Sequence, residues 1–350
     1  MIRTLLVEGH AISSVHALGA LDYMHSTGML DDLCDIYCYS FGALIIACYC
    51  LTGGFRNVLR DLQTSGVKRA CMLLQCMLNA AVAIPGIRTV NSSTLRNALQ
   101  KLLPGERKLG DLQRSGICVH VLVCCADSLT TRIFNSSRHA DVDLLDVLMA
   151  SCALPFVFRP VRIGTEFFID GGVYSGMSHI RTRGKGSETV LVGSTGTCKL
   201  HYGLNCFEQL WTILLAVQKT KLQRRARGIR ILNMPLRHSI TLRAGPSALK
   251  RMYYTGATLA SAEFALHALN LSTARMKCCG LSAYTAMIPL PATQSDADMM
   301  RHLQAAGVSI VHAHHTHMTW RRPLCNCCCT SVVWSSLKEE TERKRNVRSA

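Results

Sequence analysis

A serine stands at a break in an otherwise apolar stretch of the chain. Ser40 lies in CDIYCYSFGALIIACYCLTGG, residues 34 to 54, between a β-prone segment and a run typical of a helix. In a sharp strand-to-helix turn, a serine hydroxyl projects above the sheet, and the N-terminus of the following helix lies under a reacting carbonyl group. Small flanking residues allow the strained backbone of such a nucleophile turn. Gly42 meets this requirement, whereas Cys38 occupies the other position where glycine is usual.

The same stretch has a second interpretation, as a membrane span. No residue from Ile36 to Phe55 is charged, and a span needs roughly 20 mostly apolar residues. The run nevertheless contains three tyrosines and three glycines, with turn residues near its start and a helix stop at its end. A buried strand followed by a buried helix gives the same hydropathy. We therefore favour the strand, turn and helix.

Histidines offer a rival catalytic arrangement for this serine. A hydrolase with serine, aspartate and histidine in chain order needs a late base, for which His179 and His201 are candidates without a recognisable local motif. His10 and His16 lie near the N-terminus, where a histidine on a loop or helix face is more often structural. His10 could instead donate a hydrogen bond to an oxyanion.

The C-terminal tail gathers histidines and cysteines. They are His312, His314, His315, His317, Cys325, Cys327, Cys328 and Cys329. Zinc sites usually show paired ligands at regular spacings, and this crowding lacks that regularity. A solvated tail is therefore the simplest interpretation, with metal binding and S-acylation beside Arg321 and Arg322 as alternatives.

A basic segment overlaps the end of an apolar helix expected at residues 207–227. The segment is KTKLQRRARGIR, residues 219–230, and the helix contains Trp211. Such a segment could rest on anionic lipid, or it could be a solvated helix end where cations meet the C-terminal dipole.

Charge and composition narrow the classes of partner. The chain has 39 basic and 22 acidic residues, a formal charge of +17 that favours anionic partners. Only 6% of residues are aromatic, and no basic stripe is interleaved with them, so we do not expect nucleic acid to bind. We expect a phospholipid or other acyl lipid and an anionic membrane surface as partners, and the sequence identifies no protein partner.

The cysteines and the N-terminal residues indicate in which cellular compartment the protein resides. Many of the 18 cysteines lie inside apolar runs such as HVLVCCADS, which favours buried free thiols over disulfides. The start, MIRTLLVEGH, lacks the apolar region and cleavage site of a secretory signal peptide. We expect a cytoplasmic protein that can associate peripherally with membranes.

Hydrophobic periodicity predicts alternating strands and helices. Strands are expected at residues 2–9, 35–39, 117–127, 189–195 and 229–235, with a pair of short strands across 159–172. Helices are expected at residues 13–30, 43–54, 55–63, 68–83, 94–103, 142–155, 207–227 and 247–269. This alternation predicts an α/β fold of three layers, with a mainly parallel sheet and helices on both faces.

Three stretches, taken in order, resemble the patatin-like phospholipase family. LLVEGHAISSVHALGAL, residues 5–21, is similar to the family's glycine-rich loop and first helix. YCYSFGALIIA, residues 37–47, looks like its serine turn. MASCALPFVFRPVRIGTEFFIDGGVYSGMS, residues 149–178, resembles the third motif and is the most specific of the three. The resemblance covers about residues 1 to 270 and implies the patatin-like version of the three-layer fold.

The resemblance implies a lipid acyl hydrolase that works with a serine and aspartate dyad. Ser40 corresponds to the nucleophile that attacks the fatty-acyl ester, and Asp170 to the base that takes its proton. A buried carboxyl group with a raised pKa is suited to that task. Neither a metal nor an organic cofactor is expected. The accompanying positions are an oxyanion hole at Gly9, His10, Ala11 and Ile12, and elbow and turn residues at Cys38, Gly42, Gly171 and Gly172.

The glycine-rich loop departs from the family pattern. Gly9, His10, Ala11 and Ser14 stand where the family has glycines, so only the first is retained. Backbone N–H groups survive such substitutions, but we expect strained positive backbone angles at His10 and Ala11. A catalytically impaired relative that binds lipid or a protein partner is therefore the alternative function.

Hydrophobic periodicity becomes weak beyond about residue 290, which suggests that the chain has two parts. We expect the hydrolase domain to span residues 1–290, and a histidine-rich, cysteine-rich and basic extension, partly disordered, to follow over residues 291–350.

Overall fold

The first two strand and helix pairs form the centre of a parallel sheet. β1 (Thr4–Val7) leads into α1 (Val15–Ser26), and β2 (Asp35–Cys38) leads into α2 (Phe41–Thr52). The two strands are parallel, and every residue of β1 is buried. Apolar strands of this kind, covered on both faces, are typical of parallel sheets. In the computed structural model these elements follow the sequence prediction closely.

The structure describes about three fifths of the chain in several segments. They are residues 2–63, 92–103, 105–155, 157–174, 177, 180, 188–193, 229–234, 244–268, 276–278, 281–289, 308–315, 317–323 and 330–335. The helices predicted at residues 68–83 and 207–227 lie outside these segments. The chain divides into two compact units, residues 1–253 and 254–350.

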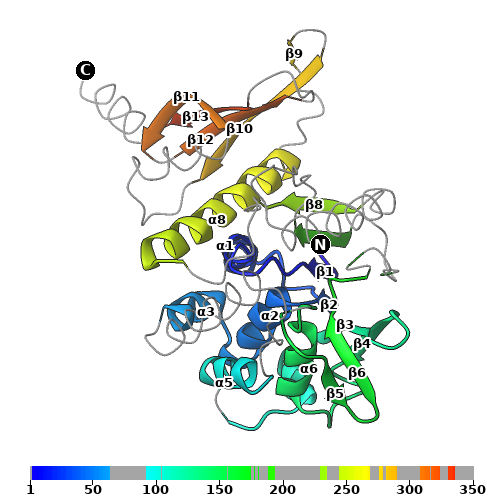
Figure 1. The fold of residues 1–350 in the computed structure, drawn as a ribbon. Helices are drawn as coiled ribbons and strands as arrows, with labels where there is room; N and C mark the ends of the chain where they lie inside the picture. The colour runs from blue at the N-terminus through cyan, green and yellow to red at the C-terminus, as the bar shows by residue number, and fades with distance from the viewer. Residues whose placement is uncertain are drawn as a thin grey trace, which may run out of the picture. The chain divides into compact units, whose positions relative to one another are not determined.

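The first unit contains an eight-stranded sheet. Its remaining strands are β3 (Cys118–Cys125), β4 (Thr131–Asn135), β5 (Val161–Ile163), β6 (Glu166–Asp170), β7 (Thr189–Gly193) and β8 (Arg230–Asn233). The strand order is β5-β6-β3-β2-β1-β7-β8, and β4 pairs with β3 (Figure 1). The neighbours from β3 to β8 run parallel, whereas β4, β5 and β6 are antiparallel additions. The predicted α/β fold with a mainly parallel sheet is confirmed. β4 was not predicted.

Helices surround this sheet. They include α3 (Phe55–Leu62), α5 (Ser92–Leu102), α6 (Leu144–Ser151) and the short 3₁₀ helix η1 (Leu109–Ser115). A further helix, α8 (Pro246–Ala268), begins in the first unit and ends in the second. α6 packs against β3, β5 and β6. Its N-cap is Asp143, whose carboxylate accepts a hydrogen bond from the N–H of Asp146 at 2.9 Å. The last residue of this helix is Ser151, which is fully buried.

One contact in the first unit depends on a glycine. A Cβ atom at Gly19 of α1 would lie 1.7 Å from the carbonyl oxygen of Tyr253, so only glycine allows this approach. The Tyr253 hydroxyl in turn donates a hydrogen bond to Asp22, and Arg56 Nε donates to the same carboxylate at 3.1 Å. These bonds join the start of α8 to α1 and α3.

The apolar stretch around Ser40 is divided between elements. Among the described residues, no single helix has the length and apolar character needed to cross a membrane. α2 and α3 together meet that criterion, but the chain bends by 115° between them.

The second unit contains a five-stranded sheet that the sequence did not predict. Its strands are β9 (Met276–Cys278), β10 (Leu281–Pro289), β11 (Val308–His315), β12 (His317–Pro323) and β13 (Thr330–Ser335), in the order β11-β13-β12-β10-β9. The domain boundary expected near residue 290 stays a prediction. Cys325 and the other tail cysteines lie outside the described residues.

Candidate active site

Ser40 occupies a strained turn at the carboxyl end of β2. Its backbone has φ 52° and ψ −136°, a region that residues with a side chain rarely adopt. The Ser40 N–H donates a 2.8 Å hydrogen bond to Ser151 Oγ, and that hydroxyl donates to the carbonyl oxygen of Leu122 at 2.9 Å. Ser151 at the end of α6 therefore helps to hold the strained turn in place.

Two glycines let the chain pass close to this turn. A Cβ atom at Gly9 would lie 2.6 Å from Cβ of Ser40, and one at Gly42 would lie 2.8 Å from the carbonyl oxygen of Val7. Neither position can accept a side chain without movement of the backbone. The loop after β1 is thus in direct contact with the serine.

Cys38 stands in the turn where glycine was expected. Its side chain is fully buried, and Sγ lies 3.7 Å from the carbonyl oxygen of His120 as a weak donor. Burial raises the pKa of the Cys38 thiol well above its ordinary value. The thiol is therefore neutral and acts as a small apolar side chain in the sheet.

Asp170 lies at the end of β6 with its carboxyl group buried beside Ser40. The residue is 1% exposed, and Oδ1 accepts a 2.7 Å hydrogen bond from the N–H of Gly172. Burial raises the pKa of Asp170 to about 7, against the opposing influence of hydrogen bonding from Ser40 and from Gly172. The structure thus brings the two predicted dyad residues together although they are far apart in sequence.

The second oxygen of Asp170 is not fully satisfied. Among the described residues, no donor reaches Oδ2 with good hydrogen-bond geometry. The Ser40 hydroxyl is nevertheless close enough to favour the charged form of the carboxyl group. Catalytic hydrogen bonds are often poorly aligned before substrate binds. An oxygen left free beside a serine is in a suitable state to receive that hydroxyl's proton.

Two glycines shape the turn after Asp170. A Cβ atom at Gly171 would lie 2.3 Å from the carbonyl oxygen of Leu122, and one at Gly172 would lie 2.8 Å from Cε2 of Tyr39. The predicted tight turn at these two glycines is therefore present, and it is packed against the residue that precedes Ser40.

The loop predicted to hold the oxyanion has an unusual backbone. Ala11 has a positive φ of 48°, as predicted, whereas His10 is not among the described residues with positive φ. The N–H of His10 donates a 2.7 Å hydrogen bond to Ser14 Oγ. The expectation of strain at His10 was wrong, because the Ser14 hydroxyl stabilises an ordinary turn there. Gly9, Ala11 and Ile12 remain predicted oxyanion donors.

A buried acid beside this loop was not predicted. Glu8 Oε2 lies 3.1 Å from His10 Nε2, and the two side chains are 7% and 10% exposed, respectively. The hydroxyl of Tyr39 interacts with the same carboxylate, and burial, followed by the charges of Glu8 and Asp170, raises the pKa of Tyr39 well above its ordinary value. A neutral tyrosine thus links the loop after β1 to the aspartate. A glutamate that ends an apolar strand was the signal available in the sequence.

The other histidines do not enter the site as described. Nδ1 of the buried His16 hydrogen-bonds the carbonyl oxygen of Ser13 at 2.8 Å, which is a structural role within α1. His179 and His201, the bases of the rival triad, lie outside the described residues.

Comparisons with known proteins identify one protein family and several solved structures that this chain resembles. Residues 10–178 match the sequence model of the patatin-like phospholipases. A search of curated proteins found no match. The crystal structure of VipD from Legionella pneumophila is 14% identical and aligns over 75% of this chain and 66% of that one, with a TM-score of 0.43. The type III effector ExoU is 13% identical over 87% of this chain and 59% of its own, with a TM-score of 0.39.

A third solved structure contains a protein partner. The ExoU–SpcU complex from the type III secretion system of Pseudomonas aeruginosa is 13% identical over 87% of this chain and 65% of that chain, with a TM-score of 0.31. The chain therefore spans between 59% and 66% of the length of these three structures.

Proposed function

We propose that this chain, whose residues 10–178 form a patatin-like phospholipase domain, hydrolyses fatty-acyl esters of lipids in the manner of a phospholipase A. The observation that carries the proposal is the strained Ser40 turn beside the buried carboxyl group of Asp170. Strained backbone of this kind occurs often at catalytic residues. The pairing of a half-buried turn hydroxyl with a buried carboxyl group gives a nucleophile and its base.

In the proposed reaction, Ser40 Oγ attacks the ester carbonyl carbon while Asp170 Oδ2 accepts the hydroxyl proton. The proton then passes from Asp170 to the leaving alcohol as the carbonyl reforms and the ester C–O bond breaks, which leaves an acyl group on Ser40. Asp170 next takes a proton from water as the water attacks this acyl-enzyme, and it returns the proton to Ser40 Oγ as the acyl C–Oγ bond breaks and the fatty acid leaves. A base with a pKa of about 7 is well matched to these transfers near neutral pH.

The oxyanion that forms during each attack needs donors. We assign this role to the backbone N–H groups of Gly9, Ala11 and Ile12, supported by the positive end of the α2 dipole directly after Ser40. The contact between Gly9 and Ser40 supports the assignment, because it brings this loop against the nucleophile. The N–H of His10 is less suitable, since it already binds Ser14.

The hydrogen bond from the N–H of His10 to Ser14 also favours a second candidate function, an impaired hydrolase that binds lipid or a protein partner. Loss of one oxyanion donor reduces transition-state stabilisation by about 3 kcal/mol, or roughly a hundredfold in rate. A chain that has lost more than one donor would keep the acyl-binding site without useful turnover.

A fluorophosphonate probe separates the two functions, because it reacts covalently only with an activated serine. The purified chain should be labelled, Ser40→Ala should abolish labelling, and Ser128→Ala, at an exposed serine, should leave it intact. Folded protein that resists the probe would favour the binding function. Fatty-acid release from a panel of phospholipid and triacylglycerol vesicles would then identify the substrate.

We further propose that the protein is cytoplasmic and acts at the surface of anionic membranes. The net charge of +17 supports this, since clustered cations are attracted to anionic headgroups. Most of the basic segment at residues 219–230 lies outside the described residues. Sedimentation with vesicles containing phosphatidylserine should be strong at low salt and weaken as salt rises, and binding unaffected by salt would contradict the proposal.

A further inference from the structure

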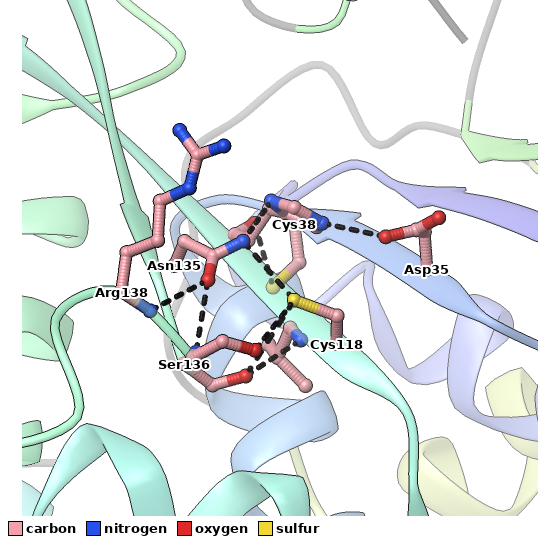
Figure 2. Close-up of polar contacts among 9 residues, drawn as sticks. Asp35, Cys38, Cys118, Asn135, Ser136 and Arg138 are labelled. Atoms are coloured by element: carbon pink, nitrogen blue, oxygen red, sulfur yellow. Dashed lines mark hydrogen bonds and ion pairs between the residues drawn. The ribbon is translucent and has the colours of Figure 1, made fainter. Parts of the chain in front are cut away.

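A polar cluster lies at the opposite end of β2 from Ser40. Asp35, Cys118 and His120 come from β2 and β3, and Asn135 ends β4 (Figure 2). Asp35 pairs in register with Cys118, and His120 pairs with Asn135, so the four side chains share one face of the sheet. Ser40 lies five residues after Asp35 along the chain, which at strand spacing places the two residues roughly 16 Å apart. This cluster is therefore separate from the proposed active site.

The hydrogen bonds in the cluster define the state of its imidazole ring. Asn135 Oδ1 accepts from the backbone N–H groups of Ser137 at 2.8 Å and Arg138 at 3.0 Å. These two bonds orient the amide so that its NH₂ group faces the ring. Nδ2 then donates to His120 Nδ1 at 3.0 Å, which makes Nδ1 an acceptor and leaves the ring proton on Nε2.

The same amide nitrogen also faces a cysteine. Asn135 Nδ2 donates to Cys118 Sγ at 3.0 Å (Figure 2), so the sulfur and the Nδ1 atom of His120 accept hydrogen bonds from one NH₂ group. On the far side of the ring, Nε2 donates to Asp35 Oδ1 at 2.8 Å. The ring of Tyr37 stacks on the imidazole with centroids 4.1 Å apart and holds its plane. A metal-binding histidine commonly donates its other ring N–H to a carboxylate, as His120 donates to Asp35 here.

We propose that Cys118 and His120 bind a divalent transition metal ion, with Asp35 as the supporting carboxylate. One potential ligand atom from each of the three residues lies within 4.8 Å of the other two. Tetrahedral zinc bonds place ligand atoms roughly 3.3–3.8 Å apart, so an ion binds here once the Asn135 amide, which contacts both Cys118 Sγ and His120 Nδ1, moves aside. All three residues are half-buried, so none of them is sealed from solvent.

The donor set selects the class of ion. A thiolate and an imidazole favour Zn²⁺ or Co²⁺ and disfavour Mg²⁺ and Ca²⁺, which prefer oxygen ligands. The ion replaces the two N–H contacts that Asn135 now makes, and Cys118 releases its proton to solvent as the metal–sulfur bond forms. Binding must therefore weaken as the pH falls.

Zinc protection of the cysteine tests the site in the unaltered protein. The full-length chain is stripped with a chelator, incubated with Zn²⁺ or Mg²⁺, alkylated with iodoacetamide, and analysed by peptide mass spectrometry. Zn²⁺ should slow alkylation of Cys118 at least about tenfold, while Mg²⁺ does not. Cys34 is the matched control, because it is also half-buried and precedes β2 but lies outside the cluster. Equal alkylation of Cys118 with and without zinc would overturn the proposal.

Cobalt spectroscopy then identifies the ligands. Because the tail cysteines could compete for metal, the full-length background carries serine at positions 325, 327, 328 and 329. Co²⁺ should give a thiolate charge-transfer band that Cys118→Ser removes and Cys34→Ser retains. Asp35→Asn should weaken binding by roughly tenfold or more. A band that survives Cys118→Ser would contradict the assignment.

One isosteric change is expected to strengthen the site. Asn135→Asp keeps an oxygen for the N–H groups of Ser137 and Arg138, and replaces the NH₂ group with a carboxylate oxygen that faces Sγ and Nδ1. With a third ligand supplied, Co²⁺ should bind at least about tenfold more tightly. If the network is purely structural, Asn135→Asp removes the two N–H donors of the amide and adds no metal affinity. Unchanged or weaker Co²⁺ binding would therefore contradict the proposal.

Discussion

The polar groups at the two ends of strand β2 differ in backbone strain and in how fully they are hydrogen-bonded. At the carboxyl end, Ser40 has a positive φ, and Oδ2 of the nearby Asp170 is buried with no well-placed donor among the described residues. At the amino end, Asp35, His120 and Asn135 form a continuous set of hydrogen bonds on ordinary strand backbone. Strain and an unsatisfied carboxyl group belong to a site prepared for reaction, whereas a satisfied network stabilises the fold until a stronger ligand displaces part of it.

The largest expected effect is the loss of turnover in Ser40→Ala. Removal of the nucleophile should lower fatty-acid release by about a thousandfold or more, because the proposed acyl-enzyme forms on Ser40. The melting temperature should barely change, since alanine fits the same turn and the N–H bond to Ser151 remains. Release of fatty acid from vesicles and calorimetry check the two parts. Substantial residual turnover would mean that Ser40 is not the nucleophile.

Asp170→Asn should abolish turnover and yet stabilise the protein at high pH. The pKa of Asp170 is raised from 3.8 to about 7, so its favourable contribution is complete below pH 3.8 and is lost as the pH rises through about 7. Asparagine does not ionise and avoids this loss, which amounts to up to about 4 kcal/mol. Urea denaturation of both proteins at pH 4 and pH 8 should therefore show the gain only at pH 8.

The pH dependence of the wild-type reaction provides the control for that variant. Since the base must be ionised, kcat/KM should rise with pH through a midpoint near 7. A profile without this limb, or an Asp170→Asn protein that retains turnover, would assign the base to another residue.

Ser151→Ala tests whether the strained turn needs its anchor. The change removes the acceptor for the Ser40 N–H and should lower the free energy of unfolding by about 1–3 kcal/mol, with a fall in kcat larger than any change in KM. Ser151→Thr, which keeps a hydroxyl, is the matched variant and should restore part of the activity. Equal stability of the alanine variant and the wild type would show that the turn is held by packing alone.

The smallest expected effect is at the other end of β2. Asp35→Asn weakens a half-exposed bond to His120, so the stability should fall by about 1 kcal/mol or less. The same isosteric change thus has opposite signs at the two ends of the strand when both are measured at pH 8 by urea denaturation. A stabilising effect of Asp35→Asn would remove the distinction drawn between them.

The sequence revealed the parts of the site that lie close together along the chain. β2, the Ser40 turn and α2 follow one another, so hydrophobic patterning and Gly42 were sufficient to predict them. Asp170 was found through the resemblance of its flanking motif. Ser151 was missed because it is 111 residues from Ser40 and lies in an ordinary helical pattern. The strands of the second unit were missed because their histidines and basic residues obscure any alternation.

By itself the sequence determined most of the strands and helices of the first unit and the mainly parallel character of its sheet, because local patterns carry this information. The resemblance of longer motifs added Asp170 to Ser40 as the predicted dyad. Only the tertiary structure decided that Asp170 is buried beside Ser40, that Ser14 occupies the N–H of His10, and that Cys118, His120 and Asn135 meet on one sheet face. Burial, backbone strain and the convergence of lone pairs depend on distances between segments remote in sequence, and no local pattern encodes those distances.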